Sequence, residues 1–253
     1  MPQPVFRVVI PARYQATRLP GKVLLNIAGK PMLQHVFECA KRSGAQQVVI
    51  ATDHEKVKQT AESMGAEVIL TSAAHQSGTD RIAEVADILG WSDTDLVVNL
   101  QGDEPLMPAE LINQVAANLA QCEEASMATL CQQIDNEQEF LNPNVVKVVR
   151  DEAGLALYFS RASIPFDRSE VANHFGYRHL GIYAYRVQFL KAFAHWQAVE
   201  LERLESLEQL RALAKGHRIH VAVANQPMPP GVDTIEDLQQ VEALMAKKAR
   251  LSS

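Results

Sequence analysis

Short apolar runs alternate with longer segments of helical periodicity through the first half of the chain, and this alternation limits the possible folds more than any other feature. Uninterrupted apolar runs predict buried strands, and apolar residues at helical spacing predict helices. We expect the strands at 5–10, 47–51, 67–70 and 95–100 and the helices at 32–42, 55–64, 80–89 and 108–120. Such alternation is typical of a parallel sheet that is covered on both faces. The sequence therefore predicts an α/β fold with a doubly wound, mostly parallel sheet.

A different pattern begins at about residue 145. The apolar ranges 145–149 and 155–159 flank the turn-forming residues 151–154, which predicts an antiparallel hairpin. Further along we expect a strand at 177–185, a helix at 202–215, a strand at 219–224 and a final helix at 234–247. We divide the chain into an α/β region at 1–135, a smaller hairpin-rich lobe at 136–200, and a return to the main sheet with a C-terminal helix at 201–253.

Composition and charge exclude several classes of protein. Of the 253 residues, 47% are hydrophobic, yet no stretch approaches the roughly 18 apolar residues of a membrane-spanning helix. The formal net charge is -6 and no block of Lys or Arg is present, so we expect neither nucleic acid nor membrane as a partner. The N-terminus lacks a basic leader, and Cys39, Cys122 and Cys131 form no Cys-x-x-Cys pair. We therefore expect a cytoplasmic protein with reduced thiols and no zinc site.

The loop at 11–22 follows the first expected strand and carries three cations. Ligands of open α/β sheets bind at the carboxyl ends of the strands, where this loop begins. Arg13, Arg18 and Lys22 are spaced so that a loop wrapped around a triphosphate could direct all three side chains inward. The loop matches neither the P-loop pattern nor the dinucleotide fingerprint. A solvated basic loop explains these residues equally well at this point.

Two aspartates are candidates for a metal site. Asp103 follows the expected strand at 95–100, where a carboxylate could hold a Mg²⁺ ion that bridges phosphates, although an Asx turn is an equal alternative. Asp233 precedes the last helix and could face the same ion. However, Thr234 and Asp237 have the spacing of a capping box, so the local sequence favours a helix start there.

Three polar segments have both a functional and a structural interpretation. The segment 75–81 could recognise a nucleotide base or cap the helix that follows it. The pair Ser160-Arg161 and the strand segment 178–183 could bind a sugar that carries a carboxylate, or be ordinary polar positions of a hairpin. The polar face of 205–211 is solvated unless its helix borders the cleft.

Taken together, the segments resemble the 3-deoxy-manno-octulosonate cytidylyltransferase family, whose members are also called CMP-Kdo synthetases. The matching stretches run in order from residue 9 to about 240 and are PARYQATRLPGK, GKPMLQHV, ATDHE, HQSGTDR, VVNLQGDEP, NPNVVKVV, ALYFSRASIPFDR, RHLGIYAYR, LERLESLEQLR and GVDT. The resemblance implies a nucleotidyltransferase-type sheet and transfer of CMP from CTP to the sugar acid Kdo, with release of pyrophosphate. It also implies Mg²⁺, a homodimer, and a role in lipopolysaccharide biosynthesis.

The resemblance further implies roles for individual residues. The residues implied to act in catalysis are Arg13, Lys22, Asp103 and Asp233, of which the two aspartates would hold Mg²⁺. Those implied to bind the nucleotide are Pro11, Ala12, Arg18, Ser77, Gly78, Thr79 and Gln101. Those implied to bind the sugar acid are Arg81, Arg161, His179, Tyr183, Glu208 and Gln209.

One departure and two rival interpretations remain. The segment 169–177 is shorter than in many family members, so the exact dimer interface is not defined by the resemblance. A cytidylyltransferase for sialic acid or an amino-substituted Kdo would share the first loop, and residues after Ser160 must separate these substrates. A catalytically silent nucleotide-sugar sensor would not require Lys22 together with both aspartates, which argues against that class.

Overall fold

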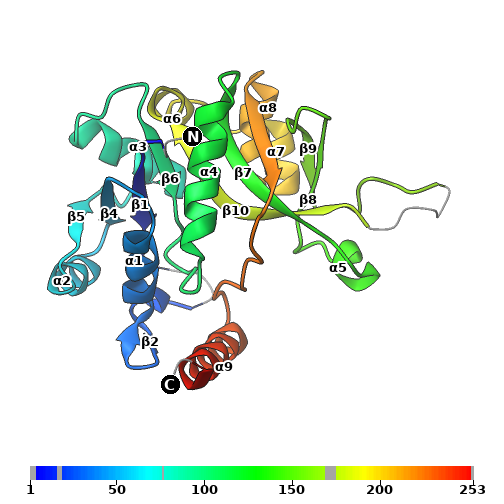
Figure 1. Cartoon of the computed structure of the whole chain (residues 1–253). Coiled ribbons are helices and arrows are strands. Elements are labelled where there is room, and N and C mark those ends of the chain that lie inside the picture. The colour runs from blue at the N-terminus through cyan, green and yellow to red at the C-terminus, as the bar shows by residue number, and fades with distance from the viewer. Residues whose placement is uncertain (1–3, 16–18, 76, 169–174, 252–253) are drawn as a thin grey trace.

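The computed structural model describes residues 4–15, 19–75, 77–168 and 175–251. Its main sheet has nine strands in the order β11-β7-β10-β6-β1-β4-β5, with β8 and β9 joined to it through β10 (Figure 1). The strands of this sheet are β1 (Arg7–Pro11), β4 (Gln47–Thr52), β5 (Glu67–Leu70), β6 (Leu96–Asn99), β7 (Ala125–Gln133), β8 (Lys147–Arg150), β9 (Ala156–Ser160), β10 (Tyr177–Arg186) and β11 (Arg218–Val223). The short strands β2 (Asn26–Ile27) and β3 (Lys30–Pro31) pair separately.

Helices cover both faces of the main sheet. They are α1 (Met32–Arg42), α2 (Glu55–Ser63), α3 (Gly78–Ile88), α4 (Ala109–Gln121), α5 (Glu137–Leu141), α6 (Val187–Ala194), α7 (Glu200–Glu205), α8 (Gln209–Ala214), α9 (Ile235–Leu251) and the 3-10 turn η1 (Lys22–Leu24). In β1, Val8 and Ile10 join a core with α1, α2 and α4, whereas Val9 joins a second core with α3, α6 and α8. This alternation follows from the two-residue period of a strand, and it confirms the predicted doubly wound arrangement.

The direction of the strands also agrees with the sequence. β1 is parallel to β4 and β6, and β4 is parallel to β5. β11 is parallel to β7 at the other end of the sheet. Only β10 runs against its neighbours β6 and β7 in the main path. The sheet is therefore mostly parallel, as predicted.

Some elements differ from the sequence prediction. The bounds of α1 and β5 match the prediction, but β7 and α6 were not predicted. The helix predicted at 202–215 is wrong, because α7 ends at Glu205 and a separate helix begins at Gln209. Ser206 has φ 51, in the left-handed region, and this conformation interrupts the helical path. The break places Glu208 at the start of α8, beside α3.

The hairpin of β8 and β9 is antiparallel, as predicted. It continues the main sheet, because β10 pairs with β8 at one end and with β6 at the other. The hairpin and α5 project from the side of the molecule (Figure 1). The division at residues 135 and 200 remains a prediction.

The C-terminal helix α9 lies apart from the main sheet, beside β2 (Figure 1). Ile27 and Met32 pack against Val232 and Val241 in a small apolar cluster that attaches this end of the chain. No helix within the described residues combines the length and the apolar composition that a bilayer span requires.

Candidate active site

The carboxyl ends of the central strands bring three distant segments together around a pocket of about 270 Å³. The segments are the loop after β1, the start of α3, and the loop after β6. Their lining residues are Pro11, Arg13, Gln15, Lys22, Val23, Ser77, Gly78, Gln101, Gly102 and Asp103. Ala12 is buried beside this pocket, and its N–H donates to the Ala51 carbonyl at 2.8 Å. Arg18 lies outside the described residues.

The pocket depends on a close approach of two backbones at Gly102. A Cβ atom at this position would lie 2.9 Å from the carbonyl oxygen of Pro11 and 3.7 Å from the Cα of Ala12. A side chain would therefore push the β6 loop away from the β1 loop. Glycine is required here because of this contact, and its backbone φ is not in the left-handed region.

Arg13 has an incompletely satisfied guanidinium on the wall of the pocket. Its Nη2 atom is buried and has no hydrogen-bond partner within the described part of the chain. Burial lowers the pKa of Arg13, and the charge of Arg81 lowers it further, while Asp53, Asp80 and Glu208 act in the opposite direction. A buried, unpaired donor is costly unless a ligand supplies an acceptor. Arg13 is therefore suited to bind an anion in this pocket.

Lys22 forms the central electrostatic contact of the site. Its Nζ donates to Asp103 Oδ2 at 2.6 Å, to Asp233 Oδ1 at 2.9 Å and to the Val232 carbonyl at 3.1 Å. Burial acts most strongly and would lower the pKa of Lys22, but the two carboxylates outweigh it, so the pKa is raised. The ammonium is charged and joins the β6 loop to the segment before α9.

The contacts of the two aspartates show which side chains form the helix cap, while the metal role of both stays a prediction. Thr234 and Asp237 form the helix cap, since Thr234 N–H donates to Asp237 Oδ2 at 2.9 Å and Asp237 N–H donates to Thr234 Oγ1 at 3.2 Å. The Asp233 N–H also donates to Asp237 Oδ2, at 3.0 Å, while its carboxylate accepts from Lys22. The carboxylate of Asp103 also accepts from Lys22. Both carboxylates therefore converge on a single cationic atom.

This convergence tests whether the residues fit Mg²⁺. Carboxylate oxygens are suitable ligands, and Mg²⁺ commonly uses one or two of them together with waters and substrate phosphates. Within the described residues no group of three or more His, Cys, Asp and Glu side chains could hold a metal alone. A pair of carboxylates beside an anion pocket fits an ion that completes its shell with phosphate, so Asp103 and Asp233 are suitable ligands.

Glu104 is a neighbour of this pair that the sequence analysis did not select. Burial raises its pKa to about 8, and the charges of Asp103 and Asp233 add to the effect. A Cβ atom on Gly231 would lie 2.9 Å from Glu104 Oε1, so the C-terminal segment packs directly on this carboxyl group. The sequence signal for Glu104 was its position directly after Asp103 in the strand-end loop.

The start of α3 contributes both a cap and a pocket wall. Ser77 Oγ accepts from the Asp80 N–H at 3.1 Å and Asp80 Oδ2 accepts from the Ser77 N–H at 3.2 Å, which forms a capping box. Ser77 and Gly78 also line the pocket. The segment therefore caps the helix, as one alternative predicted, and two of its residues also line the pocket, while recognition of a base stays a prediction.

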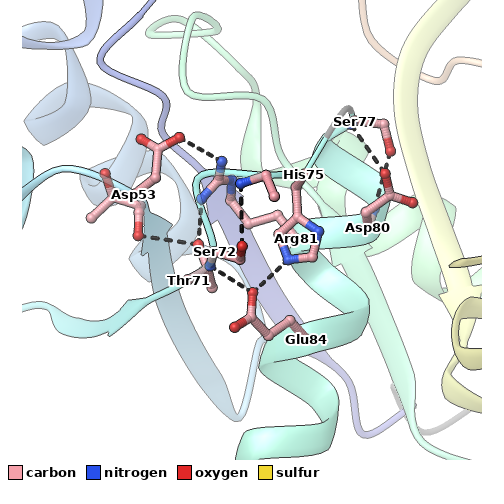
Figure 2. Close-up of polar contacts among 10 residues, drawn as sticks. Asp53, Thr71, Ser72, His75, Ser77, Asp80, Arg81 and Glu84 are labelled. Atoms are coloured by element: carbon pink, nitrogen blue, oxygen red, sulfur yellow. Dashed lines mark hydrogen bonds and ion pairs between the residues drawn. The ribbon is translucent and has the colours of Figure 1, made fainter.

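Arg81 lies in a buried network behind that turn (Figure 2). Its Nη2 donates to Asp53 Oδ2 at 2.8 Å, and its Nη1 donates to the hydroxyl of Thr71. Nearby, Glu84 accepts from the Ser72 N–H and contacts the His75 ring (Figure 2). A direct contact of Arg81 with a sugar acid would require this network to change, and that assignment stays a prediction.

Four of the predicted sugar-acid and nucleotide residues surround a second, small cavity next to the pocket. This cavity of about 40 Å³ is lined by Thr79, Met127, Tyr183, Tyr185, Phe193, Glu208 and Gln209. Thr79 Oγ1 donates to Glu208 Oε2 at 2.7 Å, which joins α3 to the start of α8. The hydroxyl of Tyr183 and Oε1 of Glu208 are buried without hydrogen-bond partners in the described residues. Burial raises the pKa of both groups.

His179 is half-buried and contacts the same aromatic residues. Its ring stacks edge-on against Phe159 at 5.2 Å and lies 5.2 Å from the ring of Tyr183. Its Nε2 contacts Thr129 Oγ1 at 3.0 Å. Burial lowers the pKa of His179 to about 3, so the ring is neutral near pH 7.

Arg161 donates to backbone carbonyls outside both cavities. Its Nε donates to the Glu205 carbonyl at 2.6 Å and its Nη1 donates to the Pro143 carbonyl at 3.0 Å. Glu205 also accepts from the Ser160 hydroxyl and from the Arg161 N–H. Arg161 therefore fastens the hairpin lobe to the end of α7, and its predicted contact with a sugar acid is untested.

The chain is similar to known cytidylyltransferases over most of its length. A family model described as cytidylyltransferase matches residues 7–219. The 3-deoxy-manno-octulosonate cytidylyltransferase of Thioalkalivibrio sulfidiphilus is 56% identical over 246 residues, covering 95% of this chain and 98% of its own. That of Hahella chejuensis is 52% identical over 252 residues, covering 96% and 99%.

A solved structure agrees with these relatives. The structure of a CMP:2-keto-3-deoxy-manno-octonic acid synthetase complexed with CTP is 40% identical, has a TM-score of 0.90, and is matched over 97% of this chain and 100% of that chain. The sequence resemblance is thereby confirmed. The chain belongs to the cytidylyltransferase family, and within it to the 3-deoxy-manno-octulosonate cytidylyltransferases.

Proposed function

We propose that this protein transfers the CMP group of CTP to 3-deoxy-manno-octulosonate (Kdo), forming CMP-Kdo and releasing pyrophosphate. One observation carries the proposal: Arg13, Lys22 and Asp103 meet in one pocket at the strand ends, in a chain that is more than half identical to enzymes with this name. The similar synthetase solved with CTP supports the choice of nucleotide.

The chain's own groups account for binding of the triphosphate. The unpaired Nη2 of Arg13 supplies a donor in fixed position, and Lys22 supplies a compact charge on the same wall. Ser77 and Gly78 place the N-terminus of α3 beside these cations, and backbone N–H groups at a helix start favour anions. These groups stabilise negative charge that accumulates as the bond between the α-phosphorus and pyrophosphate breaks.

Mg²⁺ belongs to the proposal, with Asp103 and Asp233 as its protein ligands. When bound, it supplies positive charge that polarises the α-phosphate and lowers the pKa of a nearby hydroxyl. Lys22 now occupies the space between these carboxylates. All three N–H groups of Lys22 donate to protein oxygens in this structure. To bind the triphosphate, Lys22 must therefore give up its contacts with the two carboxylates and donate to phosphate oxygens instead.

The sugar acid is proposed to bind beside the small cavity that Tyr183, Glu208 and Gln209 line. The Tyr183 hydroxyl and Oε1 of Glu208 form no hydrogen bond within the described residues, so both are suited to hydrogen bonds with sugar hydroxyls. The Thr79–Glu208 hydrogen bond places this cavity next to the nucleotide pocket, so the anomeric hydroxyl of Kdo can approach the α-phosphorus. No dedicated protein base is required for this attack.

Pyrophosphate release tests the proposal. Purified protein is supplied with CTP and Mg²⁺ and with Kdo, with sialic acid, or with no sugar. We expect pyrophosphate to be released with Kdo, and not with sialic acid or without a sugar. Release with sialic acid instead would assign another acid sugar, and CTP binding without release in any arm would indicate a nucleotide-sugar sensor.

The proposal extends to a cytoplasmic homodimer that supplies CMP-Kdo for lipopolysaccharide. Three large apolar side chains of the lobe are at least 61% exposed, namely Leu141, Leu157 and Phe166. A subunit contact on this lobe would remove such apolar surface from water. Light scattering after size exclusion measures the mass, and a mass of 28.0 kDa would contradict the dimer.

A further inference from the structure

Two loops that leave neighbouring strands place Arg13 beside Asp53. β1 and β4 are parallel with Pro11 opposite Ala51, so Arg13 and Asp53 each stand two residues beyond the last paired position. The next residues confirm that the loops stay together, because the rings of Tyr14 and His54 stack at a centroid distance of 4.0 Å. The nucleotide-facing arginine and the carboxylate are therefore neighbours.

Asp53 nevertheless forms its ion pair with a different arginine. Arg81 reaches it from α3 with Nη2 at 2.8 Å from Asp53 Oδ2, and its side chain is completely buried (Figure 2). Thr71 holds the other terminal nitrogen of Arg81 and is itself tied to β4 through two hydrogen bonds to the Thr52 carbonyl. Arg81 is thus fixed at the carboxyl ends of β4 and β5, while Nη2 of Arg13 has no partner in the described residues.

We propose that Arg81 is a positioning residue: it forms the ion pair with Asp53, so that the guanidinium of Arg13 stays available to bind the triphosphate. This inference rests on the proposed CTP-dependent function. Without Arg81, the partly buried carboxylate of Asp53 would lose its ion-pair partner, and the guanidinium of Arg13 is close enough for the charge of Asp53 to raise its pKa. Its capture by Asp53 would form an internal ion pair at the expense of nucleotide binding.

The electrostatics of Arg13 agree with this arrangement. The charge of Arg81 lowers the pKa of Arg13, and that of Asp53 raises it, so both groups lie close enough to act on its guanidinium. Like charge keeps the two arginines apart while the carboxylate attracts both. Arg81, rather than Arg13, forms the ion pair with Asp53, because Arg81 is also fixed by its hydrogen bond to Thr71 at the end of β5.

A double-mutant cycle tests the inference, with CTP affinity measured by titration calorimetry. We expect Arg81→Gln to weaken CTP binding about tenfold or more, because Arg13 moves to Asp53. Adding Asp53→Asn should restore binding to within about threefold of the wild type, since no carboxylate remains to capture Arg13. A purely structural role predicts the opposite, namely that a second substitution in the same network weakens binding further.

Two further variants serve as an independent test and as a control. Asp53→Asn alone should bind CTP at least as tightly as the wild type, and a tenfold loss there would overturn the inference even if Arg81→Gln does not fold. Arg218→Gln with Glu124→Gln removes an ion pair of 3.0 Å on the exposed surface and should leave CTP affinity unchanged. A wild-type protein that does not bind CTP would overturn the proposed function itself, whereas equal affinity in all variants would overturn only the positioning role.

Discussion

Replacing Lys22 with Met should destabilise the metal-free protein, and added Mg²⁺ should then stabilise the variant more than the wild type. Lys22 joins Asp103 and Asp233, which come from segments 130 positions apart and carry the same charge. Methionine keeps the length of the side chain and removes the ammonium. The two carboxylates would then lose the ammonium that joins them, and the segment before α9 would be held to the β6 loop by its backbone hydrogen bond without this ion pair.

The exposures of the three groups set the size of the effect. Lys22 is 13% exposed, Asp103 28% and Asp233 51%, so one partner is well shielded from water and the other is largely solvated. Breaking a fully buried ion pair costs roughly 3–5 kcal/mol, and an exposed pair contributes roughly 0–1 kcal/mol. We therefore expect a loss of about 1–2 kcal/mol, which corresponds to a fall in Tm of about 2–8 °C for a chain of this size.

Differential scanning fluorimetry in chelator and at increasing Mg²⁺ measures both parts of the prediction. Lys30→Met is the matched control, because Lys30 pairs with Glu38 at 2.7 Å on an exposed surface and should change Tm little. The reasoning is refuted if Lys22→Met has the Tm of the wild type in chelator. It is also refuted if Mg²⁺ raises the Tm of both proteins equally, since Lys22 would then not compete with the ion.

Three more predictions follow from contacts in and around the site. Gly102→Ala should lower the free energy of unfolding by about 1–3 kcal/mol in urea titrations, because its Cβ would lie 2.9 Å from the Pro11 carbonyl oxygen, whereas Gly181→Ala has nothing within 4 Å and should cost less. Asp103→Asn should reduce turnover roughly 100-fold or more at saturating Mg²⁺, and near-normal pyrophosphate release would contradict its role as a ligand. His179 has a folded-state pKa of about 3, below the unfolded value, so it contributes stability that is complete above about pH 6.5 and is lost as the pH falls toward 3. Relative to His179→Gln, the wild type should therefore lose about 1.4 kcal/mol per pH unit in urea titrations below pH 6.5, and parallel pH profiles would show that the ring is not buried neutral.

Much of the sheet followed from local sequence, and so did the expectation that Arg13, Lys22 and Asp103 lie at one edge of it. The bounds of α1 and β5 were predictable because their apolar periodicity is complete within the segment. Arg13, Lys22 and Asp103 were identifiable because each follows a central strand, and strand ends of a parallel sheet meet at one edge. These features depend on residues that are neighbours in the chain.

The remaining features depend on contacts between distant segments. The break at Ser206 interrupts a continuous helical pattern, and its consequence is the contact of Glu208 with Thr79, 129 positions away. Arg81 is a cation in a polar loop segment, which suggested ligand binding. Its burial and its contact with Asp53 are set by how α3 packs on β4. No local pattern specifies which carboxylate an arginine will meet, so this part of the site required the structure.

The attachment of Asp233 after the last strand separates the completion of the sheet from the completion of the site. Every strand of the main sheet is complete by Val223, and the family model ends at residue 219, yet one of the two convergent carboxylates comes later. The Val232 N–H donates to the Asp103 carbonyl at 2.9 Å, so the segment after the last strand docks onto the loop that follows β6. Removing the residues after β11 would leave every strand of the sheet in place and take away Asp233, so under the proposed function we expect the shortened protein to release no pyrophosphate.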